Sequence, residues 1–269
     1  MSNSAIITRR RDPLARRIKE VRDHPGGPFI FVEGPRLLEE VLRSGLAVET
    51  LIEAKNESPK AEPVWLSNIR ASARHILKVS DDVFRMLSDV EEPQGLAAVC
   101  KCPRWTWQEL LEREKRTPLV ILDGLQNPGN VAAVARTAEA AGMGGIITTA
   151  GTAHLFSPKA LRASMGSCFR LPSLEHQPVK VIIEKLAEYR FLGTAVNDSS
   201  KTIDYTAADW TPPLALVLGQ EGQGIRPEWD GHIRQSLHIP MESPVESLNV
   251  SAAAALIFYE IKRGSLRNG

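Results

Sequence analysis

The stretch Leu119–Gly142 constrains the fold most, because a short apolar run there passes through a Pro-Gly turn directly into an alanine-rich helix. Residues 119–122 are continuously apolar, which is typical of a strand buried on both faces of a parallel sheet. Asn127 followed by Pro128 predicts a helix N-cap, and Gly142 predicts the end of that helix. We therefore expect an α/β domain whose chemistry lies at this junction.

From Leu119 onward, apolar runs alternate with helical segments, which predicts a mostly parallel sheet with helices on both faces. The expected strands after the first are Gly145–Thr149, Phe191–Val196, Leu214–Leu218 and Leu237–Ile239. The expected helices are Pro158–Met165, Pro178–Tyr189, Pro227–Gln235 and Leu248–Lys262.

The length of 269 residues, 43% of them hydrophobic, predicts two domains. We divide the chain into a basic arm or helix at 1–27, a small α/β domain at 28–101, a connector at 102–117 and a larger domain at 118–265. In the small domain we expect strands at Pro28–Val32, Thr50–Glu53, Val64–Leu66 and Leu96–Val99, with a helix between Pro35 and Gly45. Two tryptophans in the connector, Trp105 and Trp107, are expected either to pack or to stack on bases.

The formal charge of +1 conceals a basic N-terminal segment. Residues 1–22 hold seven Arg or Lys against two acids, a net +5, which favours a polyanionic partner. Alternatively, the segment is a solvated helix that buries Leu14, Ile18 and Val21 and turns its arginines outward.

Three cysteines give neither a disulfide framework nor a zinc spacing, so we expect reduced thiols, a cytoplasmic location and no metal. No run approaches the roughly 18 apolar residues of a membrane span. An organellar transit peptide is an open alternative for so arginine-rich a start, although Asp12 and Pro13 argue against it.

The chain lacks a P-loop, HExxH, GxSxG and a GxGxxG placed between strand and helix. Two other segments each begin at an apolar strand and continue into a loop. They are LVLGQEGQGI at 216–225 and IPMESPVESLNV at 239–250. The first is either a close approach of backbone to a ligand or simply a turn. In the second, Ser247 or Asn249 is either part of a site or only a helix N-cap.

Together, NPGNVAAVARTA, LGQEGQG and IPMESPVESLNVSAAAAL resemble, in this order, the three motifs of the SpoU/TrmH family of RNA ribose 2′-O-methyltransferases. FVEGPRLLEEVL resembles the family's small substrate-binding domain, which is related to ribosomal protein L30e. The stretch 155–172 resembles the one that follows the first motif. The resemblance covers roughly residues 29–262. Asn127 stands where many members carry Asp, and Ala132 where many carry Gly, and we expect activity to survive both.

The resemblance implies a deep trefoil knot in the parallel sheet, S-adenosylmethionine (AdoMet) as cofactor without a metal, and a homodimer. By position, the implied cofactor-binding residues are Gly219, Ile239, Leu248, Leu218 and Met241. The implied catalytic or substrate-positioning residues are Asn130, Arg136, Glu221, Ser247 and Asn249.

Arg136 is an unsuitable base because arginine stays protonated in proteins. We therefore expect Arg136 to clamp an RNA phosphate and stabilise the developing alkoxide, while the proton leaves to phosphate, water or Glu221. Asn130 and Arg136 lie about 240° apart around one helix, which favours a site shared between two subunits.

Further RNA contacts are expected from positive charge in two places, the N-terminal segment and the stretch after the first motif, at Arg9, Arg10, Arg11, Arg16, Arg17, Lys159, Arg162 and Arg170. By analogy with the family, we expect the substrate to be ribosomal RNA rather than transfer RNA. Three alternatives stay open: a tRNA 2′-O-methyltransferase, a knotted methyltransferase acting on a base nitrogen, and a non-catalytic RNA-binding or ribosome assembly factor.

Overall fold

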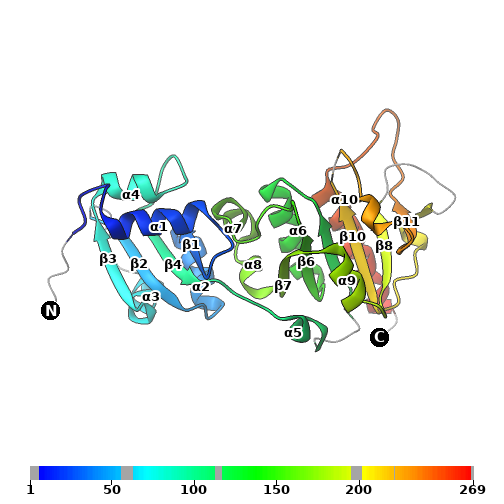
Figure 1. Cartoon of the computed structure of the whole chain (residues 1–269), viewed down its shortest axis with the longest axis horizontal. Coiled ribbons are helices and arrows are strands. Elements are labelled where there is room, and N and C mark those ends of the chain that lie inside the picture. Colours follow the sequence, from blue (N-terminus) through cyan, green and yellow to red (C-terminus); the bar gives the residue numbers. More distant parts are fainter. Residues whose placement is uncertain (1–5, 56–62, 113–116, 195–201, 221, 268–269) are drawn as a thin grey trace. The chain divides into compact units, whose positions relative to one another are not determined.

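The computed structural model describes residues 6–55, 63–112, 117–194, 202–220 and 222–267 (Figure 1). It divides into two compact units. The first contains Met1–Pro103 together with Phe156–Phe169, and the second contains Arg104–Leu155 together with Arg170–Gly269. No helix of the described residues is long and apolar enough to cross a membrane.

The first unit is built on a four-stranded mixed sheet in the order β1-β4-β2-β3. Strand β4 is antiparallel to both β1 and β2, whereas β2 and β3 are parallel. The strands are β1 (Phe29–Glu33), β2 (Val48–Ala54), β3 (His75–Val79) and β4 (Leu96–Lys101). The helices are α1 (Pro13–Asp23), α2 (Pro35–Arg43), α3 (Val64–Ser72), α4 (Asp81–Leu87) and, from later in the chain, α7 (Pro158–Ser164) and most of α8 (Ser167–Arg170).

The predicted small α/β unit is confirmed, but the strand expected at Val64–Leu66 is wrong. That segment begins helix α3, which buries Leu66 and Ile69 on one face. A spacing of three residues is the period of a helix, and three apolar residues alone are too few to distinguish it from a strand. Neither β3 nor α4 was predicted.

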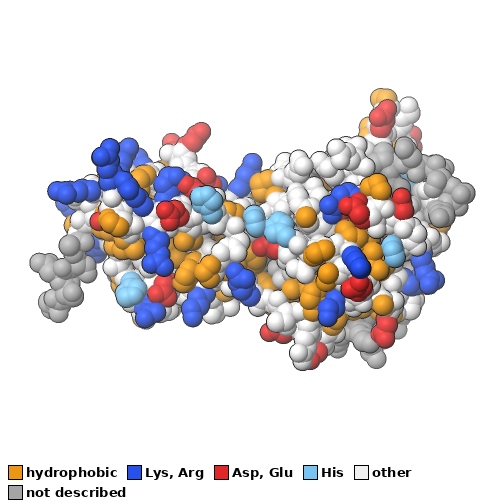
Figure 2. Space-filling model, in the orientation of Figure 1, with side chains coloured by type: hydrophobic (Ala, Val, Ile, Leu, Met, Phe, Trp, Pro, Cys, Tyr) orange, Lys and Arg blue, Asp and Glu red, His pale blue; other side chains and the backbone are white. Residues whose placement is uncertain are grey.

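Helix α1 carries the basic N-terminal segment and belongs to the first unit. Of the expected stripe, Ile18 is buried and Val21 packs against the same core, whereas Leu14 is 44% exposed and Ala15 is buried in its place. Arg22 donates to the carbonyl oxygens of residues 86–88 at the end of α4 and therefore has a structural role. Figure 2 shows other Lys and Arg side chains gathered over the region of α1.

The second unit holds a seven-stranded sheet in the order β7-β6-β5-β10-β8-β11-β9, and every pairing in it is parallel. The predicted parallel sheet is confirmed, while the knot stays a prediction. The strands are β5 (Leu119–Asp123), β6 (Gly145–Thr149), β7 (Ser173–Gln177), β8 (Arg190–Thr194), β9 (Thr202–Asp204), β10 (Leu214–Gly219) and β11 (Ile233–His238).

The helix expected at Pro227–Gln235 is wrong. Only a 3₁₀ turn forms, η2 at Pro227–Trp229, and the chain then enters β11, which pairs with β8 and β9. The apolar residues of this segment do not distinguish a helix from a strand, because a short apolar run fits the spacing of both. A second 3₁₀ turn, η1, spans Tyr205–Ala207.

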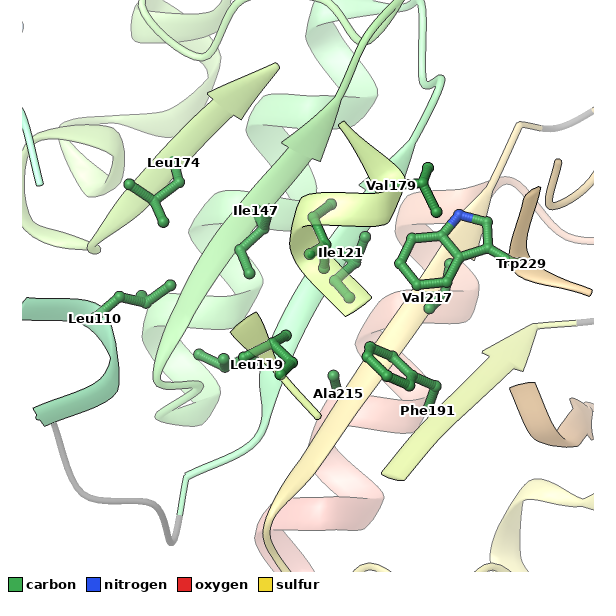
Figure 3. Packing of buried hydrophobic residues seen from close by; sticks show 12 residues of the cluster. Leu110, Leu119, Ile121, Ile147, Leu174, Val179, Phe191, Ala215, Val217 and Trp229 are labelled. Atoms are coloured by element: carbon green, nitrogen blue, oxygen red, sulfur yellow. The ribbon is translucent and has the colours of Figure 1, made fainter. Parts of the chain in front are cut away.

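Helices cover both faces of the central strands. On one face, α5 (Trp107–Glu112) and α9 (Val179–Lys185) pack on a cluster that includes Ile121, Val217 and Trp229, shown in Figure 3. Trp105 and Trp107 pack against this cluster. On the other face lie α6 (Pro128–Ala141) and α10 (Val250–Arg267), which pack on each other.

The predicted ends of α6 are confirmed. Asn127 caps the helix by accepting a hydrogen bond from the backbone N–H of Gly129 at 2.8 Å. Gly142 ends it with φ at 84°, a left-handed conformation that glycine adopts without strain. The start of α6 is thereby fixed at the carboxyl end of β5, where the sequence places the first motif.

Candidate active site

A pocket lies at the carboxyl ends of β8, β10 and β11, the edge of a parallel sheet where ligands commonly bind. The segment between β11 and α10 and the first turns of α10 complete its wall. Its lining residues are Thr194, Gly219, Gln220, Gly224, Leu237, His238, Ile239, Met241, Glu246, Ser247, Leu248, Val250, Ala253 and Ile257. Most of them are apolar, with Ser247, Glu246 and His238 among the polar groups.

The pocket includes four of the five residues for which the sequence implies a cofactor role: Gly219, Ile239, Met241 and Leu248. The fifth, Leu218, is fully buried in β10 and does not line the pocket. Its side chain is a core residue because neighbouring strand residues point to opposite faces of a sheet whose two faces are both covered.

The loop after β10 approaches the backbone of Gly219 closely. The backbone groups of Gln220 and Gly224 exchange two hydrogen bonds, of 3.0 and 2.8 Å, which fold the loop back on itself. A Cβ atom on Gly219 would lie 2.6 Å from the carbonyl oxygen of Gly224. Gly219 is therefore required by steric crowding, and the loop leaves backbone groups beside the pocket.

An ion pair between Asp123 and Arg226 fastens this loop to the neighbouring strand. Asp123 ends β5, where it pairs in register with Gly219 of β10, and its side chain is completely buried. Arg226 donates to it from its backbone N at 2.9 Å, from Nε at 2.9 Å and from Nη2 at 2.6 Å. Thr149 of β6 donates a further hydrogen bond at 2.9 Å.

These contacts keep Asp123 ionised. Burial alone would raise its pKa, but the hydrogen bonds from the side chain and backbone of Arg226 and from Thr149 outweigh burial and lower the pKa of Asp123. The same pair raises the pKa of Arg226. A buried carboxylate with this many donors is a fixed anchor rather than a general base at neutral pH.

Asn249 and Asn130 come together although they are 119 positions apart. Asn249 Nδ2 donates to Asn130 Oδ1 at 3.2 Å. Its other amide atom, Oδ1, accepts from the backbone N of Ser251 at 2.9 Å and from Ser251 Oγ at 2.6 Å, which caps α10. Asn249 is therefore a helix cap and at the same time a link to the first motif.

A second contact links the far ends of the same two helices, because Lys262 Nζ donates to the carbonyl oxygen of Ala140 at 3.0 Å. The N-terminal ends meet through the two asparagines and the C-terminal ends through this contact, so α6 and α10 run in the same direction. The first and third motifs are thereby held together at one end of the sheet.

The other implied catalytic residues differ in their surroundings. Ser247 lines the pocket. Arg136 is exposed on α6, does not line the pocket, and forms no hydrogen bond or ion pair with any described residue. Glu221 lies outside the described residues.

The expected RNA-contacting residues fall into two groups. Lys159 and the five arginines at 9, 10, 11, 16 and 17 are exposed. Arg162 pairs with Asp89 at 2.7 Å, and Arg170 pairs with both carboxylate oxygens of Glu139 at 2.6 and 3.0 Å. These two guanidinium groups already have anionic partners within the protein.

The sequence analysis missed the roles of Asp123 and Arg226 and the pocket residues Thr194, Leu237, His238 and Glu246. A polar residue at the end of a buried strand is a local signal that could have singled out Asp123. Nothing local connects Asp123 to Arg226, since the two are 103 positions apart.

Comparison with known proteins places both parts of the chain. Residues 117–259 match the SpoU rRNA methylase family, and residues 16–98 match an MRM3-like substrate binding domain. The chain is 30% identical over 234 residues to the 23S rRNA (guanosine(2553)-2'-O)-methyltransferase RlmP of Bacillus subtilis, covering 86% of this chain and 88% of that protein.

Solved structures agree over nearly the full length. A structure described as an RNA 2'-O ribose methyltransferase is 28% identical, with a TM-score of 0.77 over 97% of this chain and 100% of the other. An AdoMet-bound rRNA methyltransferase from Sinorhizobium meliloti, at 24% identity and a TM-score of 0.81, covers 98% and 99% and shares the fold. With a family match over more than half of its residues and a relative aligned over most of both chains, this protein belongs to the SpoU methylase family.

Proposed function

We propose that this protein transfers the methyl group of AdoMet to a ribose 2′-hydroxyl of ribosomal RNA. The observation that carries the proposal is the meeting of the three motifs at one end of the parallel sheet. There, the second and third motifs line one pocket, and Asn249 of the third bonds Asn130 of the first. The RlmP relative is named for this reaction on 23S rRNA.

The pocket residues fit AdoMet. Leu237, Ile239 and Leu248 offer an apolar wall for an adenine ring, and the crowded backbone at Gly219 can approach a ligand closely. Glu246 and Ser247 supply polar groups at the wall. Bound AdoMet supplies an activated methyl group on its sulfonium, so the protein has to align the ribose oxygen with it and accommodate the hydroxyl proton.

Arg136 provides positive charge for the RNA. Its guanidinium is exposed and has no partner among the described residues. It therefore holds a phosphate next to the target ribose and stabilises negative charge that develops on the 2′-oxygen. Asn130 and Asn249 position the ribose, and the proton passes to phosphate, water or Glu221.

A second copy of the chain completes the site. Helix α10 leaves Leu256 and Tyr259 exposed at 43% and 51%, on a surface that also includes Ala252 and Ala255. Exposed apolar side chains grouped on one helix face favour burial against another protein surface. A Leu256→Glu variant should shift the dimer to monomer in analytical ultracentrifugation, whereas Glu184→Gln, an exposed change on α9 at the other face of the sheet, should not.

The remaining assignments follow from the family. The domains proposed at 28–101 and 118–265 correspond to an L30e-like RNA-binding part and a knotted methyltransferase part, preceded by the basic segment 1–27 and joined by 102–117. We place the reaction in the cytoplasm, where ribosomal RNA is available to such an enzyme.

The test is methyl transfer from labelled AdoMet to separated ribosomal and transfer RNA that lack native modification, followed by nucleoside mass analysis. We expect a 2′-O-methyl nucleoside in ribosomal RNA, abolished by Arg136→Ala while AdoMet affinity is unchanged. A product in transfer RNA would select the alternative substrate, and a base-methylated nucleoside would overturn the reaction. AdoMet binding without transfer to free RNA or to ribosomal particles would indicate a non-catalytic binding factor.

A further inference from the structure

Two histidines and a glutamate meet where the loop after β6 passes the end of β7. His154 Nδ1 lies 3.0 Å from His176 Nε2 and 3.5 Å from Glu175 Oε1. One ligand atom from each residue falls within 4.8 Å of the other two. None of these residues lines the pocket described above. We propose that His154, Glu175 and His176 bind a divalent transition metal ion, with Zn²⁺ as the best match.

A β-bulge in strand β7 makes this cluster. Ile147 pairs with Leu174 and Thr149 pairs with Gln177, so Glu175 and His176 both stand opposite the single residue Thr148. In a regular strand, consecutive side chains point to opposite faces, and a bulge redirects one of them. His176 has φ at 53°, and its backbone N donates to Thr148 Oγ1 at 2.9 Å, which holds the bulge in place.

The spacing of the ligand atoms suits a tetrahedral ion. With metal–ligand bonds of 2.0–2.1 Å, the edge between two ligands of a tetrahedral site is about 3.3 Å. The observed separations of 3.0 and 3.5 Å lie on either side of that value. The third separation, between the ligand atoms of Glu175 and His176, is within 4.8 Å, so two of the three ligand pairs already lie near the tetrahedral spacing.

The donor set selects the kind of ion. Two imidazoles and one carboxylate suit Zn²⁺ and its neighbours, whereas Mg²⁺ and Ca²⁺ prefer oxygen ligands. The backbone N–H of Leu155 donates to Glu175 Oε1 at 2.7 Å and orients the carboxylate, as supporting contacts do in metal sites. The His154 side chain is 33% exposed, which leaves a fourth position for water and a path for the ion.

An ion here would fasten the loop after β6 to the edge strand β7. The same loop is attached to the segment that follows β5, because the N–H of Ala153 donates to the carbonyl oxygen of Leu125 at 2.8 Å. We therefore expect a stabilising metal rather than a catalytic one. Without an ion, one ring donates an N–H hydrogen bond to the other. The experiment must distinguish this metal-free pair from a metal-bound one.

The experiment uses the full-length, tag-free protein carrying Cys102→Ser to remove the partly exposed thiol. After treatment with a chelator, Co²⁺ is titrated and followed by visible absorption, and Zn²⁺ by calorimetry. We expect one ion per chain, an intense absorption typical of tetrahedral Co²⁺, and a rise of several degrees in melting temperature on adding Zn²⁺. His154→Gln and His176→Gln should each weaken binding by at least tenfold.

His75→Gln is the matched control, since His75 is exposed in the first unit and should leave affinity unchanged. To guard against misfolding of the variants, imidazole nitrogen resonances of the unsubstituted protein provide a second measurement. Zn²⁺ should shift those of His154 and His176 and leave those of His75 in place. Equal affinity in all variants, more than one weak ion per chain, or unshifted His154 and His176 resonances would overturn the proposal.

Discussion

Asn249 Nδ2 donates a hydrogen bond to Asn130 Oδ1 at 3.2 Å, so the residue that caps α10 also bonds a residue in the first turn of α6. The two parallel helices thereby bring the first and third sequence motifs together at the carboxyl end of the sheet. Capping and positioning are separable, because they use different atoms of the same amide.

Replacing Asn249 tests this separation. Asn249→Ser keeps a good N-cap but cannot reach Asn130, whereas Asn249→Ala loses both and should reduce the free energy of unfolding by about 1 kcal/mol. Because both variants lack the link, both should lower methyl transfer about five- to tenfold, equivalent to one hydrogen bond of about 1 kcal/mol. Urea unfolding and initial rates measure the two effects. Full activity of the serine variant would show that the link does not position the site.

From the ion pair of Asp123 with Arg226 we predict that the free energy of unfolding falls in acid. The pKa of Asp123 is lowered by folding. Its carboxylate therefore stabilises the fold above the unfolded-state pKa of about 3.9, and this stabilisation is lost as pH falls through the lower folded-state pKa.

Asp123→Asn should reduce the free energy of unfolding at pH 7 by about 2–3 kcal/mol, because it leaves Arg226 without its buried partner. The difference from the unsubstituted protein should shrink as pH falls through the folded-state pKa of Asp123, because below it both proteins carry a neutral side chain at this position. Asp230→Asn, an exposed change directly after the nearby 3₁₀ turn, is the control and should be neutral. A constant difference across this pH range would contradict the assignment.

From the crowding around Gly219 we predict that replacing it with alanine weakens AdoMet binding. In Gly219→Ala the new Cβ would clash with the backbone of Gly224, so the loop after β10 must move and AdoMet affinity should fall at least tenfold. Gly222→Ala in the same loop meets no atom within 4 Å and should bind normally. Calorimetric titration with AdoMet compares the two, and equal affinities would show that the loop does not form the pocket wall.

Arg136→Lys tests whether the guanidinium binds phosphate with two parallel hydrogen bonds. Lysine keeps the charge but lacks the planar fork, so turnover should fall about tenfold or more. Stability should stay within about 0.5 kcal/mol, because Arg136 is exposed and has no partner among the described residues. Near-normal turnover of Arg136→Lys would show that Arg136 contributes only its positive charge to catalysis.

We predict that the exposed arginines of helix α1 contribute to RNA affinity and that this contribution weakens with added salt. Arg16→Gln with Arg17→Gln removes two exposed charges and should reduce the slope of log affinity against log salt by about one to two, without changing AdoMet affinity. Arg22→Gln should instead destabilise the first unit, since it removes the contacts to the end of α4. An unchanged slope in the double variant would remove α1 from the RNA-binding surface.

Local sequence determined the elements around the first motif. The apolar run 119–122 and the Asn127 and Gly142 signals correctly predicted β5 and both ends of α6, because caps and buried strands depend on neighbouring residues. The order of apolar runs likewise predicted the parallel sheet. The implied pocket residues came from the ordered motifs and the family resemblance rather than from local physics.

Tertiary structure decided the rest. Strand β7 was not predicted, because its sequence, SLEHQ, is largely polar and its pairing depends on β6. Val64 begins a helix because α3 buries Leu66 and Ile69 in the first unit. Asp123 with Arg226, Asn130 with Asn249, and His154 with His176 are pairs that only the folded chain brings together. Such contacts depend on strand order and register, which no local pattern in the sequence encodes.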